Sequence, residues 1–133
     1  PTINTLTGVT FGNKTFVAVG YNGNIVRSTD NGSSFSTVTS PNNYYIKGVT
    51  FGNNTFVAVG NSGNIVRSTN NGESWDNATF PTSHYLYGVG FGNNTFVAVG
   101  ELGIIFRSTD NGSSWENVTS PTGNQLNGVT FSE

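Results

Sequence analysis

The sequence predicts an all-β fold, a β-propeller, from three observations: an internal repeat, a turn-rich composition and strands that are apolar on both faces. The segment GVTFGNKTFVAVG begins at Gly8 and recurs almost unchanged at Gly48 and Gly88. A partial copy, GVTFSE, begins at Gly128. Successive copies therefore start 40 residues apart. A repeat of about 40 to 50 residues built from strands is typical of one four-stranded propeller blade.

The composition agrees with short strands joined by turns. Only 9% of the 133 residues are charged, 18 are glycine, and much of the rest is Asn, Ser and Thr, which favours β-structure over helices. A chain of this length fits one domain. We therefore predict a single partial propeller over residues 1–133, with blade repeats at 8–47, 48–87 and 88–127 and an extra first strand at 128–133.

Turn signals place four strands in each repeat. In the second copy we expect them at 48–51, 55–59, 64–69 and 74–79. The second of these, TFVAV, is apolar on both faces, so both faces must be covered, as they are between stacked blades. The predicted core between blades comprises Phe56, Val57, Ala58, Val59 and Ile65, with their counterparts in the other copies.

Charge and cysteine content exclude several classes of function. The net charge is −2 and the five basic residues are scattered singly, which disfavours a nucleic-acid partner. Without cysteine there is no disulfide or thiolate metal site, and the compartment stays undetermined. No apolar run is long enough to span a membrane, so we expect a soluble protein without a membrane partner.

The most polar repeated stretch is RSTDNGSSW (107–115), with close copies at 27–35 and 67–75. Its carboxylate or amide can accept hydrogen bonds from its own turn, its glycine supplies a positive φ, and its aromatic residue can pack back over the hairpin. Neither a calcium loop nor a catalytic acid fits, because the spacing is wrong and Asn70 replaces Asp in the middle copy. We predict that the structural residues of these turns are Asp30, Gly32, Phe35, Asn70, Gly72, Trp75, Asp110, Gly112 and Trp115.

These three stretches resemble the Asp-box, or bacterial neuraminidase repeat, S-x-D-x-G-x-x-W. The resemblance covers three full repeats and nearly the whole chain, and it implies a turn between the third and fourth strands of a blade, at the periphery. It does not carry sialidase activity. The family's arginine triad comes from non-equivalent positions, whereas Arg27, Arg67 and Arg107 are copies of one position. We expect no catalytic residue, no metal and no cofactor.

The connectors between blades vary where the rest of the repeat does not. They read PNNYYIK (41–47), PTSHYLY (81–87) and PTGNQLN (121–127). Their aromatic residues suit stacking on a sugar or docking a peptide. The alternative is that Ile46, Leu86 and Leu126 anchor the connectors while the tyrosines lie on the surface without binding a ligand. The predicted ligand-binding residues are Tyr44, Tyr45, Lys47, His84, Tyr85 and Tyr87.

Three classes of function follow. The first is a non-catalytic scaffold or interaction module, natural or built by amplifying one blade; the second is a carbohydrate-binding lectin; the third, least supported, is a fragment of a sialidase-like hydrolase. Three blades leave two open faces, so we expect a homo-oligomer, with a six-bladed dimer favoured. The fourth copy of the first strand leaves open a strand-swapped seam, an excerpt of a longer propeller, or a larger assembly.

Overall fold

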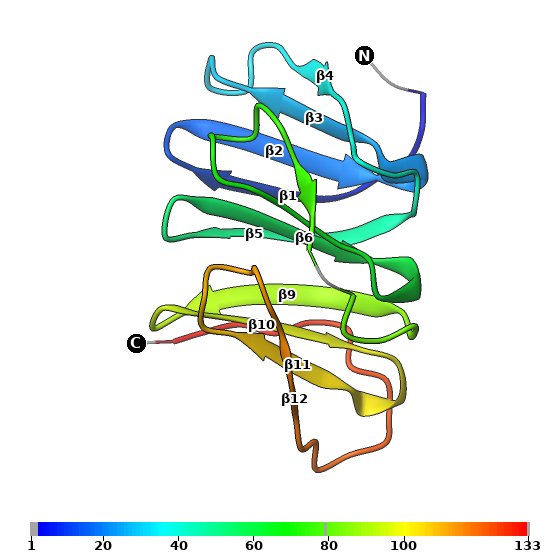
Figure 1. Ribbon diagram of the computed structural model, residues 1–133. Helices are drawn as coiled ribbons and strands as arrows, with labels where there is room; N and C mark the ends of the chain where they lie inside the picture. Colours follow the sequence, from blue (N-terminus) through cyan, green and yellow to red (C-terminus); the bar gives the residue numbers. More distant parts are fainter. Residues whose placement is uncertain (1–2, 79, 133) are drawn as a thin grey trace.

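The computed structural model describes residues 3–78 and 80–132 and contains three four-stranded antiparallel sheets, with strands in chain order within each (Figure 1). The first sheet, blade 1, comprises β1 (Leu6–Gly12), β2 (Thr15–Gly20), β3 (Ile25–Ser28) and β4 (Ser36–Val38). Blade 2 comprises β5 (Ile46–Gly52), β6 (Thr55–Gly60), β7 (Ile65–Ser68) and β8 (Asp76–Asn77). Blade 3 comprises β9 (Leu86–Gly92), β10 (Thr95–Gly100), β11 (Ile105–Ser108) and β12 (Glu116–Val118).

The expected all-β fold is confirmed. The helical elements of the described residues are three single 3-10 turns, η1 (Tyr21–Gly23), η2 (Asn61–Gly63) and η3 (Glu101–Gly103), one between the second and third strands of each blade. No helix in the described part of the chain is both long and apolar enough to cross a membrane.

The blades stack face to face, and the core lies between them (Figure 1). The predicted core residues Phe56, Val57, Ala58, Val59 and Ile65 are all 0% exposed, as expected. Because successive side chains of a strand point to opposite faces, β6 sends Phe56 and Ala58 into the cluster shared with blade 1, and Val57 and Val59 into the cluster shared with blade 3. Burying one such Phe or Val side chain contributes roughly 1.5–3 kcal/mol.

The innermost strands of neighbouring blades approach closely because of a repeated glycine. The ring of Phe51 lies on Gly12, and that of Phe91 lies on Gly52, so a Cβ at either glycine would overlap the ring. The Phe–Gly pair of each GVTFG or GVGFG segment therefore serves two interfaces. Its phenylalanine packs on the preceding blade, and its glycine receives the phenylalanine of the next.

The structure differs from the expected strands at two places. The fourth strand of the second copy, expected at 74–79, is reduced to Asp76–Asn77, because Ser74 and Trp75 belong to the hairpin loop; Thr79 lies outside the described residues. The extra strand expected at 128–133 is also wrong for residues 128–132, which form no strand, and Glu133 is not described. Every strand in the described part of the chain already belongs to one of the three sheets.

The loops divide into two ends of the stack (Figure 1). At one end, here called the hairpin face, lie the tight turns 13–14, 53–54 and 93–94 and the loops 29–35, 69–75 and 109–115; Asn13 Nδ2 donates to Asn71 Oδ1 of the next blade over 3.2 Å. At the other end, the connector face, the connectors 41–47 and 81–87 lie beside η1–η3. There Glu101 N donates to the Tyr85 carbonyl over 3.0 Å.

Candidate functional site

Each loop of the hairpin face is closed by its own polar side chains. In blade 1, Ser28 Oγ donates to Asp30 Oδ1 over 2.7 Å, and Ser34 N donates to the same oxygen over 2.9 Å. Hydrogen bonds from Ser34 and Ser28 lower the pKa of Asp30 to about 2, and bonds from Ser114 and Ser108 lower that of Asp110 to about 2. The carboxylates are therefore ionised and already hydrogen-bonded within their loops.

The middle copy makes the same bonds without a charge. Ser68 Oγ and Ser74 N donate to Asn70 Oδ1 over 2.9 and 3.0 Å, and Asn70 Nδ2 donates to Ser74 Oγ over 2.7 Å. An amide that replaces a carboxylate while preserving the loop indicates that the position closes a turn.

The glycine and the aromatic residue of each loop act together. Gly32, Gly72 and Gly112 have φ values of 83°, 81° and 83°, which side chains with a Cβ rarely adopt. Trp75 Nε1 donates to the Gly72 carbonyl over 3.1 Å, and the indole is only 6% exposed. Trp115 makes the same bond to Gly112 at 3.0 Å but is half-buried, as is Phe35.

Two of the three repeated arginines link neighbouring blades, and the three have different hydrogen-bond partners. Arg27 Nε donates to the carbonyl of Asn71 over 3.3 Å, and Arg67 Nε donates to that of Asn111 over 3.0 Å. Arg107, on the last blade, instead donates to Glu116 of its own sheet. Each arginine belongs to the third strand of its blade, and Arg27 and Arg67 bond to hairpin loops of the next blade.

The connector face carries a cluster of one lysine and four tyrosines. Lys47 Nζ lies 4.5 Å from the ring centroid of Tyr45, 4.7 Å from that of Tyr87 and 5.6 Å from that of Tyr85. The rings of Tyr45 and Tyr21 lie 4.1 Å apart between centroids. We call Tyr21, Tyr45, Lys47, Tyr85 and Tyr87 the Lys–Tyr cluster. Such contacts place the ammonium against the negative faces of the rings.

Two phenols of this cluster, Tyr45 and Tyr87, hold their protons strongly. Hydrogen bonding to Tyr21, together with burial, raises the pKa of Tyr45 to about 12. Burial, with smaller effects of Glu101 and Tyr85, also raises the pKa of Tyr87. At neutral pH the cluster offers hydroxyl donors beside an ammonium group.

The remaining predicted binding residues lie at the edges of this cluster. His84 Nδ1 is 4.0 Å from Glu101 Oε1, and the same carboxylate accepts from Tyr85 N. Tyr44 is 43% exposed and meets Phe80 edge-on, with 6.1 Å between ring centroids. The structure thus brings together Tyr45, Lys47, Tyr85 and Tyr87, while His84 and Tyr44 flank them.

Sequence reasoning missed Tyr21 as a site residue. It lies in η1, a turn that reads YNGN in the first copy, NSGN in the second and ELGI in the third. Variation of that turn between copies was the available signal, and the same signal marks Glu101. Among the residues that the structure describes, no group of three or more His, Cys, Asp or Glu side chains could hold a metal ion.

Comparison with known proteins defines the fold class. No protein-family model and no curated protein matches the chain. A structure of YCF48 bound to a D1 peptide matches with a TM-score of 0.81 and 21% identity over 95% of this chain and 43% of that one. The computationally designed Ika4 protein matches with a TM-score of 0.77 and 12% identity, over 100% and 83% of the two chains. An ancestral GH74 enzyme matches at 0.72 and 23% identity, over 91% and 19%.

These similarities, with the three stacked sheets, assign the chain to the β-propeller fold. The chain spans less than half the length of the YCF48 structure that it matches.

Proposed function

We propose that this chain is a non-catalytic interaction module of the β-propeller fold that binds an extended peptide at its connector face. The observation that carries the proposal is the Lys–Tyr cluster, in which Lys47 lies among the rings of Tyr45, Tyr85 and Tyr87. Aromatic rings of this kind provide a large contact area with little loss of conformational entropy, and they are enriched where proteins bind partners.

The chemistry of the cluster suits a peptide. Exposed ring faces can cover apolar side chains, while the Lys47 ammonium and the phenol hydroxyls can donate to carbonyl or carboxylate oxygens. Tyr21 and Tyr85 are 42% and 38% exposed, so both are accessible from solvent. The similar YCF48 structure was bound to a peptide, which supports the idea that stacked blades of this kind can hold one.

The cluster is absent from the third connector, which supports a specialised role. Residues 125 and 127, which correspond to Tyr85 and Tyr87, are Gln and Asn. Anchoring is nevertheless retained, because residues 46, 86 and 126 are Ile, Leu and Leu. The fold therefore needs the anchor in every connector but does not need the tyrosines.

We assign the loops of the hairpin face to the Asp-box type and give them a structural role. Their carboxylates are bonded to serines of their own loops, and Arg27 and Arg67 bond to backbone carbonyls of the next blade. These groups are engaged in holding loops and blades, which supports a module without catalytic activity.

A carbohydrate is the alternative ligand, favoured by the exposure of Tyr44 and Tyr85; Tyr44 directly follows Asn43, whose amide is exposed, in the connector. A tyrosine ring can stack on a sugar face while neighbouring amides bond its hydroxyls. This alternative uses the same face of the molecule, so the same variants serve for both ligands, and the probe distinguishes a sugar from a peptide.

The test is selection of a phage-displayed random peptide library on the full chain, followed by binding of the selected peptides to variants. We expect the double variant Tyr45→Ala/Lys47→Ala to lose at least about tenfold in affinity, as for removal of contacts worth about 1.4 kcal/mol. The control is Asp30→Asn on the hairpin face, which should bind normally. Selected peptides that bind the double variant and the wild type equally would contradict the proposal.

A glycan array, probed with the same three proteins, tests the alternative. Glycan binding by the wild type that is lost in the double variant, with no peptide selected from the library, would show that the ligand is a sugar and not a peptide.

A further inference from the structure

Blade 1 exposes, on β1, apolar residues whose equivalents in blades 2 and 3 are covered by the preceding blade. On β1, Leu6, Val9 and Phe11 are 44%, 63% and 53% exposed. The residues equivalent to Leu6 on β5 and β9, Ile46 and Leu86, are 0% exposed because a preceding blade covers them. Contiguous exposed apolar surface of this kind indicates an interaction site.

The two open faces are complementary halves of an interface that the chain already contains twice. Between blades 1 and 2, Val17, Val19 and Ile25 pack against Phe56, Ala58 and Val66. Between blades 2 and 3, Val57, Val59 and Ile65 pack against Phe96, Ala98 and Phe106. The outer face of blade 3 presents the first half again, and the outer face of blade 1 presents the second. The equivalent residues are Val97, Val99 and Ile105 on blade 3, and Phe16, Ala18 and Val26 on blade 1. Phe16, Val97 and Ile105 are partly exposed, whereas Ala18, Val26 and Val99 are already at most 7% exposed within one chain.

The occupant that fits the open face of blade 3 is therefore blade 1 of another copy of this chain. The two faces differ, since one carries two valines and an isoleucine and the other carries a phenylalanine, an alanine and a valine. A contact between unlike faces is head-to-tail and closes into a ring when its rotation allows.

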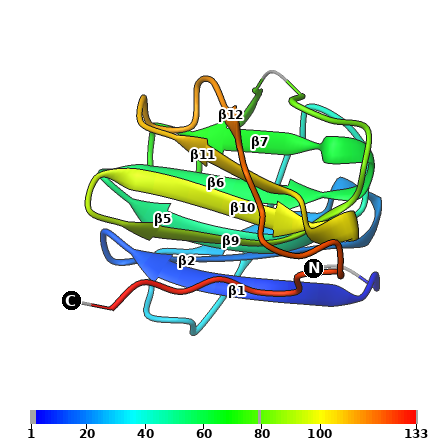
Figure 2. The ribbon, with the colours of Figure 1, turned by 90° about the horizontal axis from the view of Figure 1, so that it is seen from below.

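The C-terminal segment 121–131 already lies on blade 3 in the place of a next innermost strand (Figure 2). The ring of Phe131 lies on Gly92, as that of Phe51 lies on Gly12, and Gly128 lies against Gly88 as Gly48 lies against Gly8. Leu126 N also donates to the Gly100 carbonyl over 3.0 Å. The sequence PTGNQLNGVTF of this segment nearly repeats PTINTLTGVTF at 1–11.

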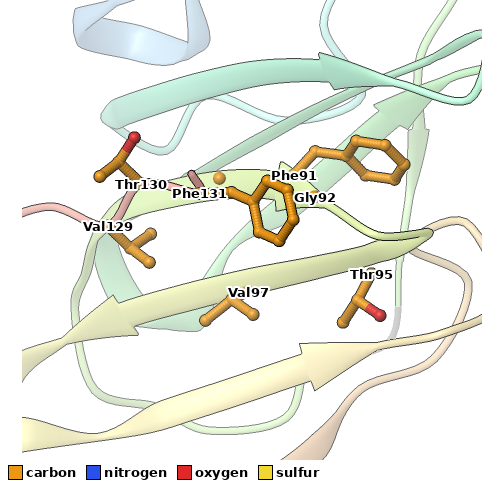
Figure 3. Close-up of a pocket in the computed structure, with 8 residues that line it drawn as sticks. Phe91, Gly92, Thr95, Val97, Val129, Thr130 and Phe131 are labelled. Atoms are coloured by element: carbon orange, nitrogen blue, oxygen red, sulfur yellow. The ribbon is translucent and has the colours of Figure 1, made fainter. Parts of the chain in front are cut away.

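A cavity of about 70 Å³ remains between this segment and blade 3 (Figure 3). Thr95, Val97, Val129 and Phe131 are among its lining residues. Inside the chain, a phenylalanine of the second strand occupies the corresponding place: Phe56 lies 4.6 Å from Phe51, between ring centroids, and packs in the cluster that contains Val17. The cavity is therefore where Phe16 of a second copy would pack against Phe131.

We propose that a second copy of this chain docks its first blade on blade 3, and that segment 121–131 replaces β1 in the sheet of that copy. In the register that β1 now holds with β2, Val9 lies opposite Ala18 and Phe11 opposite Phe16. Segment 121–131 would place Val129 and Phe131 opposite the same two residues of the second copy, and β1 would be displaced. Two such contacts between two chains give six blades, within the roughly four to eight of known propellers.

The hairpin face supports the same seam. Gly72 and Gly112 are buried against Val17 and Val57 of the preceding blades, whereas Gly32 is exposed. Arg107, which now bonds to Glu116, corresponds to Arg27 and Arg67, which bond to the carbonyls of Asn71 and Asn111. Docking a second copy would bring its Asn31 carbonyl to Arg107 and would cover its Gly32.

Light scattering coupled to size-exclusion chromatography tests the docking. We expect the mass of two chains for the wild type, and of one chain for Val97→Lys, with an unchanged far-ultraviolet circular dichroism spectrum. The control, Thr119→Lys, adds the same charge at an exposed site and should keep the mass of two chains. A one-chain mass for the wild type at micromolar concentration, or a two-chain mass for Val97→Lys, would overturn the proposal.

Cysteine pairs test the exchange of strands, and they are unambiguous because the chain has no cysteine. We expect Val129→Cys/Ala18→Cys to give a covalent dimer on a non-reducing gel, because cross-strand neighbours lie within disulfide range. The matched pair Val9→Cys/Ala18→Cys should form no bond within one chain. Formation of the second bond without the first would overturn the exchange. Neither result depends on peptide or glycan binding, so the seam and the proposed function can fail separately.

Discussion

The hairpin face and the connector face are built from the same 40-residue repeat but carry different information. On the hairpin face the three loops have nearly the same sequence, and Asp30, Asn70 and Asp110 each close their own loop. On the connector face the copies differ, and the side chains that distinguish them meet across blades, as Lys47 does with Tyr87. Within a repeat protein, the difference separates what every blade requires from what one place on the surface can do.

That contrast predicts the kind of defect each face should give. A change in a hairpin loop should lower stability and leave binding by the folded protein intact, whereas a change in the Lys–Tyr cluster should mainly weaken binding. Four measurements test this contrast, and they follow in order of decreasing expected effect.

Trp75→Ala should have the largest effect. The indole is 6% exposed, packs in the core cluster between blades 1 and 2, and bonds to Gly72. Removing a buried Trp typically lowers the free energy of unfolding by about 3–5 kcal/mol. Urea unfolding followed by circular dichroism measures it. Phe35→Ala, at the equivalent half-buried position, should cost clearly less, and equal losses would contradict the importance of the covering blade.

Asp110→Ala should lower the free energy of unfolding by on the order of 1 kcal/mol, because Ser114 N and Ser108 Oγ lose their acceptor. Asp110→Asn should cost less, since Asn70 makes the same bonds in blade 2. The measurement is the same urea titration. Loss of peptide binding with an unchanged unfolding midpoint would instead indicate that the loop carries a binding site.

Acid should remove the stability that the charged loops contribute. The folded-state pKa values of Asp30 and Asp110 are about 2, below the ordinary 3.8. A lowered pKa means that the contribution is complete above the ordinary value and is lost as pH falls from about 4 through 2. The melting temperature of Asp30→Asn/Asp110→Asn should therefore fall less than that of the wild type between pH 5 and pH 2. Parallel curves would exclude this account.

Alkali should act on the connector face. The pKa of Tyr45 is raised to about 12 from 10.0, so its contribution to stability is complete below pH 10 and is lost as pH rises through 12. Tyr21→Phe removes the hydrogen-bond partner and should lower the pKa of Tyr45 towards 10. Ultraviolet titration of tyrosinate absorbance detects the late-titrating phenol. An unchanged titration in Tyr21→Phe would show that burial alone raises the pKa.

The core residues could be predicted from the sequence, because their apolar pattern is local and recurs in every repeat. TFVAV at 55–59 is apolar on both faces, which requires cover on both sides, and the structure buries Phe56 and Val57 completely. The bounds of short strands at the outer edge were predicted less accurately. A strand was expected at 74–79, but the structure has one only at Asp76–Asn77, because the loop that closes on Asn70 extends to Ser74.

The all-β propeller blades and the hairpin loops can be predicted from the sequence, because turns, strand alternation and loop-closing hydrogen bonds involve residues close together in the chain. The contacts of Tyr21 with Tyr45, of Lys47 with Tyr87, and of segment 121–131 with blade 3 arise only when the blades pack together. These contacts join residues from different blades. They depend on how closely the innermost strands approach and on the order in which the blades stack.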